Sequence, residues 1–134
     1  MPDPFKFELV SPERLLVSGE AEQVLVPGSE GDMTILAHHA PLLTTLRPGV
    51  LDIGFPGGER QRYFIRGGFA EVGPKGLTVL AETAIDLREL DAGQLAQAVT
   101  DAEEDVADAK SDNARDRAQT KLDQLRQVQA ALSL

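Results

Sequence analysis

The residues with the most chemical potential in this chain gather between Val26 and Gly49, in the run VPGSEGDMTILAHHAPLLTTLRPG. Its His38 and His39 are the only histidines of the chain. Adjacent residues of an extended segment point to opposite faces, so these two rings cannot easily bind one metal ion. Zinc takes three or four protein ligands, and the chain has no cysteine. The pattern predicts no metal site and indicates a structural or contact role beside the turn before Pro41.

The same run contains an acidic turn, Ser29-Glu30-Gly31-Asp32, that has some features of a phosphate or calcium loop. A phosphate loop would end in Gly-Lys-Ser or Gly-Lys-Thr before a helix, and no lysine follows here. A calcium loop would need further oxygen ligands and a closing glutamate, which are missing. Glycine adopts positive φ readily, so the glycines indicate an exposed turn. Contact with another protein is the function that fits such a turn best.

The chain shows no arrangement that favours nucleophilic catalysis. None of its serines stands in a Gly-x-Ser-x-Gly elbow. Acids are numerous, but abundance alone does not indicate a pair for general acid–base chemistry. We therefore expect a protein that is not an enzyme by itself and that uses no cofactor. One alternative stays open, an enzyme that pairs His39 with an acid, and a pH–rate profile lost in His39→Ala would reveal it.

Length and composition limit the classes of protein that could position these residues. A chain of 134 residues, 42% hydrophobic, can form one domain, or a small domain with an appendage, around a compact core. Acids outnumber bases by 22 to 13, which argues against binding nucleic acid or anionic lipid directly. No apolar run is long enough to predict a membrane span, and the first residues lack the pattern of a signal peptide.

The first part of the chain has the pattern of short strands. FKFEL alternates Phe5, Phe7 and Leu9 with charged residues, as a half-buried strand does. Pro-Gly and Gly-Gly signals, among them Gly67-Gly68, predict turns between many of the further candidates. Short strands about ten residues apart indicate an antiparallel β-sandwich or barrel. The further candidate strands are RLLVS, EQVLV, MTILA, PLLTTL, GVLDIGF, RQRYFIR, GFAEV and LTVLAE.

The structural class changes near residue 85, because every proline lies at or before Pro74 and only one glycine, Gly93, follows Gly76. We expect a β domain over residues 1–85 and a helical hairpin over residues 86–134. Asp91 is the expected N-cap of the first helix. Polar residues in KSDNARD predict the turn between the helices. The first expected apolar seam, spaced three and four residues apart, is Leu95, Val99, Ala102, Val106 and Ala109. The second is Ala118, Leu122, Leu125 and Leu132, with Val128 beside it.

Three motifs in this order and spacing, VPGSEGDM, HAPLLTTLRPG and GGFAEV, resemble the epsilon subunit of F-type ATP synthases, which corresponds to the mitochondrial delta subunit. The resemblance spans nearly the whole chain. It implies an antiparallel β-sandwich of about ten strands followed by an antiparallel α-helical hairpin. It also implies a rotor subunit of the central stalk, bound to the gamma subunit and the c-ring, that couples proton flow to ATP synthesis. Such a subunit is peripheral to the membrane, on the cytoplasmic face of a bacterial inner membrane.

The resemblance further implies which residues contact the c-ring. The foot of the sandwich contains the acidic turn, and we expect the segment that follows His38 to lie at the same end. An acidic foot would suit this contact because the c loops of the family carry an arginine. The implied contact residues are Ser29, Glu30, Gly31, Asp32, His39, Ala40, Pro41 and Leu42.

The tail departs from the family in one respect. Some bacterial relatives bind ATP through a motif similar to Leu/Ile-Asp-x-x-Arg-Ala on the hairpin. Here the matching run, Leu90–Leu95, has Gln94 in place of the arginine. A shifted frame that starts at Ile85 places Glu89 there. Because the cation that would meet a phosphate is lost, we expect no ATP binding.

The hairpin of this family often inhibits ATP hydrolysis by extending into the catalytic head, where it meets the alpha and beta subunits. The acids of DAEEDVAD have the pattern of a solvated helix face, and antiparallel pairing would bring bases of the second helix beside some of them. The bases that could contact the catalytic head are Arg115, Arg117, Lys121 and Arg126.

A different class of protein is the alternative. A free-standing ligand-binding β-sandwich with a dimerising coiled-coil tail would show a concave apolar pocket with convergent polar groups. It would also form a stable homodimer, whereas the rotor subunit would be an isolated monomer that binds gamma.

Overall fold

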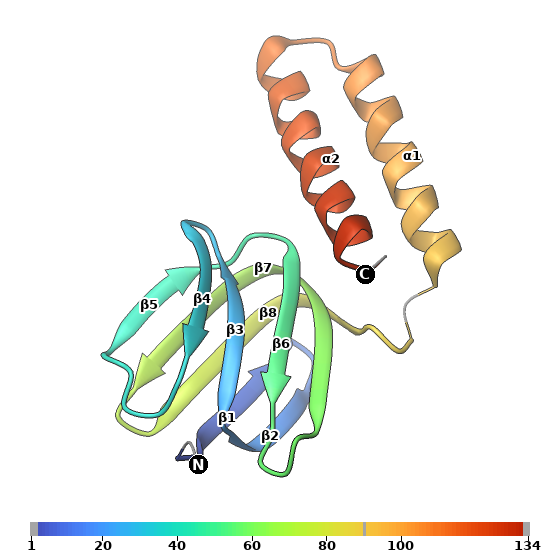
Figure 1. Cartoon of the computed structure of the whole chain (residues 1–134). Coiled ribbons are helices and arrows are strands. Elements are labelled where there is room, and N and C mark those ends of the chain that lie inside the picture. The colour runs from blue at the N-terminus through green and yellow to red at the C-terminus, as the bar shows by residue number, and fades with distance from the viewer. Residues whose placement is uncertain (1–2, 90, 133–134) are drawn as a thin grey trace. The chain divides into compact units, whose positions relative to one another are not determined.

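The computed structural model describes residues 3–89 and 91–132. The chain divides into two compact units, Met1–Arg88 and Glu89–Leu134. The first unit is a β-sandwich and the second is a pair of helices, so the predicted fold class is confirmed (Figure 1). The domain limits 1–85 and 86–134 remain a prediction.

The sandwich contains eight strands among the described residues, where about ten were expected. They hydrogen-bond in the order β2-β1-β8-β7-β6-β3-β4, and β5 pairs with β7 outside this path. All pairings are antiparallel except that of β1 with β8. The strands are β1 Phe5–Val10, β2 Leu15–Ala21, β3 Gln23–Gly28, β4 Gly31–Ile35, β5 Leu42–Thr45, β6 Gly49–Gly54, β7 Arg60–Gly73 and β8 Gly76–Asp86.

The glycine pair Gly67-Gly68 lies inside β7 and does not form the predicted turn. RQRYFIR and GFAEV, expected as separate strands, are therefore one strand. Both glycines have positive φ, +72° and +98°. The alternation of inward and outward residues shifts by one at this point: Ile65 is buried before the pair, and Ala70 is buried after it. Such a shift moves every later side chain to the other face of the strand.

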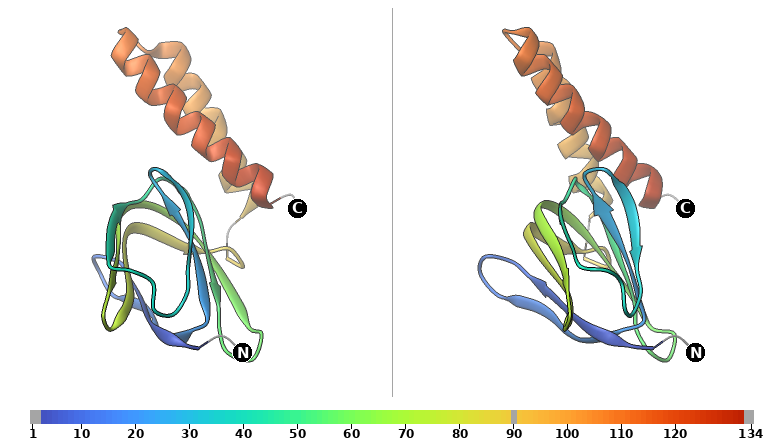
Figure 2. Two further views of the ribbon diagram at one scale, coloured as in Figure 1. Left: turned by 60° about the vertical axis from the view of Figure 1, so that its left-hand side comes forward. Right: turned by 90° about the vertical axis from the view of Figure 1, so that its left-hand side faces the viewer.

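The two halves of β7 have different neighbours. Its first half pairs with β6, from Gly49 opposite Ile65, and its second half pairs with β5, up to Thr45 opposite Phe69. One strand thus serves both layers, and the sheet folds around a single core (Figures 1 and 2). The alternating apolar residues of FKFEL enter this core, where Phe7 and Leu9 are fully buried. Burial of such side chains stabilises the fold by about 1.5–3 kcal/mol each.

The second unit is an antiparallel helical hairpin of α1, Ala92–Asp108, and α2, Asp112–Leu132. Asp91 caps α1 as expected, because its carboxylate accepts a hydrogen bond of 2.6 Å from the amide of Gly93. Residues of the predicted seams supply the apolar contacts between the helices, and three from each seam are buried. These buried residues are Leu95, Val99, Ala102, Leu122, Leu125 and Val128.

The turn between the helices is shorter than KSDNARD predicted. The second helix already begins at Asp112, because the Ser111 hydroxyl accepts a hydrogen bond of 3.1 Å from the amide of Ala114. This capping lets the polar residues after Ser111 enter the first turn of α2. No helix in the described ranges, 3–89 and 91–132, is long and apolar enough to cross a membrane.

Candidate functional site

The acidic turn connects β3 and β4 as a tight hairpin. Gly28 pairs with Gly31, which leaves Ser29 and Glu30 at the exposed tip. The Ser29 amide donates a hydrogen bond of 2.9 Å to the carbonyl of Thr45, and the Thr45 hydroxyl donates one of 2.8 Å to Ser29 Oγ. The tip is therefore fixed to the end of β5. Gly31 has a φ of +141°, in agreement with the positive φ expected for a glycine of this turn.

Arg47 anchors the base of the acidic turn. Its guanidinium donates to the carbonyl of Gly28 at 2.5 Å and forms an ion pair with the Asp32 carboxylate. The side chain of Asp32 is nevertheless 58% exposed. Arg47 was not among the residues predicted from the sequence, although it stands directly before the Pro48-Gly49 turn signal. The arrangement holds Asp32 in place and presents the acidic tip to solvent.

The segment His38–Leu42 lies at the other end of the sandwich, so the expectation of a shared end is wrong. The hairpin β3–β4 runs from Gly28 opposite Gly31 to Val24 opposite Ile35, and the histidines follow Ile35. β5 then returns from Leu42 to Thr45, beside the acidic turn. The length of β4 separates the two groups of residues, because each strand residue advances the chain by about 3.3 Å.

The two histidines have different surroundings. His38 has a φ of +65°, and its Nε2 lies 3.4 Å from the carboxylate of Asp3. The ring of His39 donates from Nδ1 to the carbonyl of Ala40 at 2.8 Å. Both residues are exposed, as are Ala40 and Pro41, while Leu42 is half-buried. The geometry fits a local turn, as expected for a structural or contact segment.

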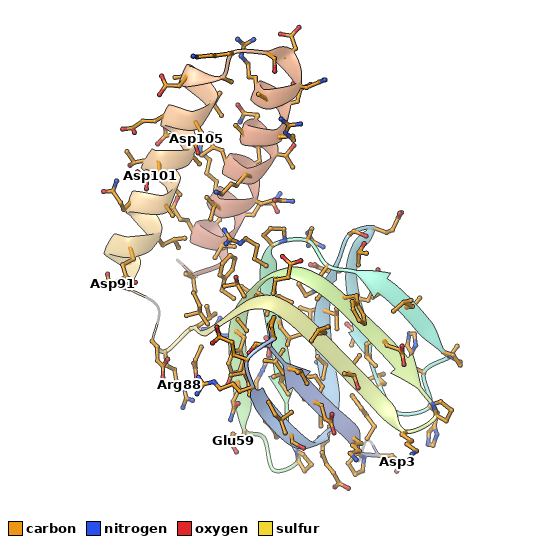
Figure 3. The ribbon with its side chains drawn as sticks, turned by 180° about the vertical axis from the view of Figure 1, so that it is seen from behind. Asp3, Glu59, Arg88, Asp91, Asp101 and Asp105 are labelled. Carbon is orange, nitrogen blue, oxygen red and sulfur yellow. The ribbon has the colours of Figure 1, made fainter. Side chains whose placement is uncertain are left out.

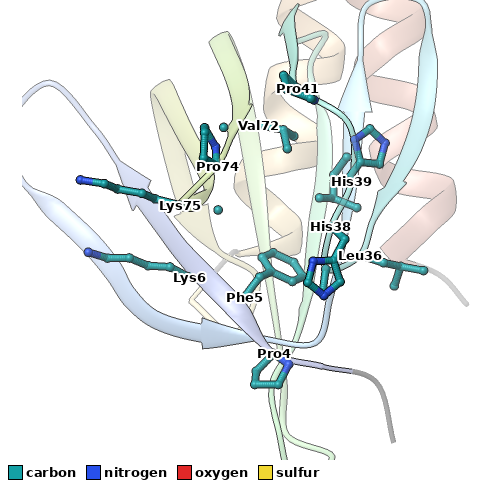
Figure 4. Close-up of a pocket in the computed structure, with 14 residues that line it drawn as sticks. Pro4, Phe5, Lys6, Leu36, His38, His39, Pro41, Val72, Pro74 and Lys75 are labelled. Carbon is teal, nitrogen blue, oxygen red and sulfur yellow. The ribbon is translucent and has the colours of Figure 1, made fainter.

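A shallow cavity of about 570 Å³ adjoins this segment (Figure 4). Its walls come from the start of β1, the His38–Pro41 loop and the β7–β8 turn, with Lys6 and Lys75 at its border. Within residues 3–89 and 91–132, no group of three or more His, Asp or Glu side chains could hold a metal ion. We find no convergent set of polar groups in the cavity that would define a ligand.

The run that corresponds to the ATP motif of some relatives, and that was expected not to bind ATP, lies at the start of α1. Leu90 lies outside the described residues. The carboxylate of Asp91 is engaged as the helix cap, and Gln94 is exposed on the first turn of α1. A neutral amide there offers no charge to a phosphate.

The four bases that could contact a catalytic head are all exposed on α2. Arg126 forms an ion pair of 3.3 Å with Glu103 across the hairpin, as the antiparallel arrangement predicted. Arg115 pairs with Asp112 at 3.5 Å on its own helix. Arg117 and Lys121 have no ion pair within the part of the chain that the structure describes. The exposed pairs contribute about 0.2–1 kcal/mol each, so these bases can exchange partners easily.

Asp86 and Arg88 form an ion pair at the end of the sandwich. The Arg88 side chain donates to both carboxylate oxygens of Asp86, with Nη2 at 2.8 Å from Oδ2. Figure 3 labels Arg88 beyond the last strand. These hydrogen bonds lower the pKa of Asp86 below its ordinary value of 3.8. The pair stays charged at neutral pH and fixes the chain where β8 ends.

Comparisons with known proteins agree over nearly the whole chain. The family model described as the ATP synthase delta/epsilon chain, β-sandwich domain, matches residues 4–87. The chain is 54% identical over 128 residues to the ATP synthase epsilon chain of Parvibaculum lavamentivorans, covering 96% of this chain and 97% of the relative. It is 49% identical over 132 residues to that of Mesorhizobium japonicum, covering 98% of each.

Solved structures show the same architecture. A chain in the mitochondrial ATP synthase of Euglena gracilis, in a structure of OSCP, F1 and the c-ring, superimposes with a TM-score of 0.84 at 27% identity. This match covers 98% of the present chain and 83% of that chain. A chain from the central stalk and c-ring of the Tetrahymena thermophila enzyme has a TM-score of 0.75 at 16% identity, which shows a common fold. The similarity thus includes both the sandwich and the hairpin.

Proposed function

The chain belongs to the family of ATP synthase delta and epsilon chains, and from this membership we propose that it is a rotor subunit of the central stalk. The observation that carries the proposal is the full-length match to epsilon chains, through sandwich and hairpin alike. In this role the chain couples proton movement through the c-ring to ATP synthesis by way of the gamma subunit. It is a component of the complex and performs no catalytic step itself.

The acidic turn is the part of the sandwich that we assign to the c-ring. Its tip is exposed and acidic, and its base is fixed by Arg47 and Thr45. A rigid tip suits torque transmission because little of the applied force is lost in bending. Charge at such a contact sets register and association rate more than affinity. Because His39–Leu42 lie at the other end, their contact with the c-ring is a separate hypothesis.

The hairpin is the candidate regulatory element. Of the three buried residues on α1, Val99 and Ala102 have side chains smaller than leucine, so this helix contributes little apolar area to the interhelical contact. Arg115, Arg117, Lys121 and Arg126 are all exposed on α2, where helix periodicity places Arg115 and Arg126 on one side of the helix and Arg117 and Lys121 on another. We assign to these bases an inhibitory contact with the alpha and beta subunits. The complex as a whole is membrane-associated, and we place this chain on the cytoplasmic face of the bacterial inner membrane.

The free-standing ligand-binding sandwich is not favoured. The curated relatives are ATP synthase epsilon chains over nearly their full length. The cavity beside His38 lacks the enclosed, convergent polar groups that a small-molecule site usually has.

The test is ATP synthesis, ATP hydrolysis and proton pumping by the complete ATP synthase, assembled without this chain, with it, or with it truncated after Arg88. We expect the complex without the chain to lose coupling and the intact chain to restore it. A rise in hydrolysis at equal synthesis on truncation would identify the hairpin as a brake. Coupled synthesis at the normal rate in a complex that lacks the chain would refute the proposed function.

A further inference from the structure

Met33 carries the only sulfur atom among residues 3–89 and 91–132, because the chain has no cysteine and its other methionine is Met1. It lies in the middle of β4, opposite Val26 on β3, and packs against the core of the sandwich. Met33 is half-buried, so solvent reaches part of it. A thioether in this position touches apolar neighbours and is also open to small oxidants.

The end of the Met33 side chain lies over the base of the acidic turn. A Cβ built at Gly28 would lie 3.4 Å from Met33 Cε and 3.6 Å from Thr44 Oγ1. The methyl group thus occupies the space that the missing side chain of Gly28 leaves open, where β3, β4 and β5 come together (Figure 1). Methionine fills such gaps well because its side chain is unbranched and flexible.

Several interactions of the acidic turn meet at Gly28. Its carbonyl accepts a hydrogen bond of 2.5 Å from Arg47. Gly28 also forms an isolated bridge with Leu46, just after β5. The next residue along the chain, Ser29, donates its amide to the carbonyl of Thr45. A displacement of Gly28 would therefore loosen the turn at several points at once.

We propose that Met33 is an oxidation site for hydroperoxides and that its oxidation loosens the acidic turn. In the reaction the sulfur lone pair attacks one peroxide oxygen, a sulfur–oxygen bond forms and the oxygen–oxygen bond breaks. Sulfur loses two electrons, and the departing oxygen takes the proton of the transferred one. The products are methionine sulfoxide and water, or an alcohol where the oxidant is an organic hydroperoxide.

The sulfoxide does not fit the place of the thioether. It is larger by one oxygen atom and polar, whereas the side chain of Met33 packs against the apolar core. The Thr44 hydroxyl already donates to the carbonyl of Thr45, so its hydrogen is not available to the new oxygen. An unpaired polar group in an apolar contact costs free energy, and overpacking adds strain. Both costs fall when the side chain moves away from Gly28, and the turn then loses this packing.

The consequence for the complete ATP synthase rests on the proposed function. That function assigns the acidic turn to the c-ring, and a loosened turn bends under load. Oxidation of Met33 therefore lowers the coupling between proton flow and ATP synthesis. The modification is reversible, because methionine sulfoxide reductases restore the thioether.

The first test is hydrogen peroxide treatment of the purified full-length chain. Mass spectrometry should show one added oxygen on the peptide that contains Met33. Amide hydrogen exchange, measured by NMR, should become at least tenfold faster at Ser29 and Arg47, whose amides donate to carbonyls of β5 and β3. The amide of Glu22 is hydrogen-bonded at the opposite end of β3, so it is the internal control and should keep its exchange rate.

Met33→Leu is the matched control variant. Leucine nearly conserves the volume and has no sulfur, so this variant should fold normally and keep its exchange rates after the same treatment. Met33→Gln places a polar group at the same position and should reproduce the faster exchange without peroxide. Reduction of the oxidised chain by a methionine sulfoxide reductase, with dithiothreitol as the reductant, should restore the original rates.

The second test is coupled ATP synthesis by the complete ATP synthase, assembled with the untreated chain or with the chain oxidised beforehand. The oxidised chain should lower the rate of synthesis at least twofold. Peroxide-treated Met33→Leu should support synthesis at the untreated rate, because the rest of the chain has received the same treatment.

The outcomes separate this inference from the proposed function. A Met33 that stays reduced while peroxide oxidises a methionine-containing peptide in the same solution would overturn the oxidation site. Unchanged exchange at Ser29 after complete oxidation would overturn the loosening of the turn, and unchanged synthesis would overturn the effect on coupling. Failure of the untreated chain to restore coupling would instead count against the proposed function itself.

Discussion

Gly68 offers a test of the structure because it lies where the alternation of buried and exposed residues along β7 shifts by one, just before Phe69. A Cβ built at Gly68 would lie 1.8 Å from the carbonyl oxygen of Leu80, on the neighbouring strand. That oxygen belongs to the backbone, so it can move only if β8 moves. The φ of +98° adds a second obstacle, since a residue with a side chain rarely adopts it. Gly68→Ala therefore combines a steric cost and a conformational cost.

Two other glycines separate these costs. Gly58 has a φ of +90° with nothing within 4 Å of a built Cβ, so Gly58→Ala should cost only the conformational term of about 1–2 kcal/mol. Gly19 has open space and no such φ, so Gly19→Ala should be neutral or stabilise by up to about 1 kcal/mol. Overpacking adds about 1–3 kcal/mol. We therefore expect Gly68→Ala to lower the free energy of unfolding by about 2–5 kcal/mol.

The assay is urea unfolding of the three variants followed by tyrosine fluorescence. Tyr63 is the only tyrosine, the chain has no tryptophan, and Tyr63 lies on β7, so the signal reports on the sandwich alone. The unfolding free energies are compared only among variants whose free energy falls with urea concentration at the same rate (equal m-value), because a changed m-value would indicate a changed denatured state. A loss for Gly68→Ala no greater than that for Gly58→Ala would refute the close approach of β7 and β8 at this point.

Three further predictions concern single contacts. Asp91→Ala should lower the stability of the hairpin by about 1 kcal/mol in thermal melts at 222 nm, whereas Asp91→Asn should retain most of it, because asparagine also caps helices. Leu125→Ala should cost about 2–4 kcal/mol in the same melts because Leu125 is buried, and the exposed Gln127→Ala should cost little. Asp86→Asn should lower the melting temperature at pH 7. Arg88 lowers the pKa of Asp86 in the folded state, so this stabilisation is complete above the unfolded pKa of about 3.8 and is lost as the pH falls through the folded value. The two proteins should therefore melt alike at the lowest pH, and a difference that persists there would contradict the ion pair as the cause.

Local patterns in the sequence were sufficient where short-range interactions dominate. The alternation of Phe5, Phe7 and Leu9 predicted β1, and the seam of Leu95 and Val99 predicted α1. Asp91 was identifiable as a cap because its hydrogen bond closes within the same turn. Each of these features depends on residues only a few positions apart, so a short window of the sequence is enough to predict it.

Features that depend on distant residues needed the structure. Gly67-Gly68 resembles a turn in sequence, but β8 lies alongside and lets β7 continue through it. The acidic turn and His39 are close in the chain, yet β4 carries them to opposite ends.

The sequence by itself determined the class of the fold and the first helix cap and the seams of the helices, because those follow from composition, spacing and local hydrogen bonds. It determined the family through the resemblance of its motifs. Only the tertiary structure decided which residues of different strands lie together. Gly28, Met33 and Thr44 meet because strand pairing and the hydrogen bonds of the acidic turn bring β3, β4 and β5 together. Pairing register is set by the packing of the whole core, and no short window of residues contains that information.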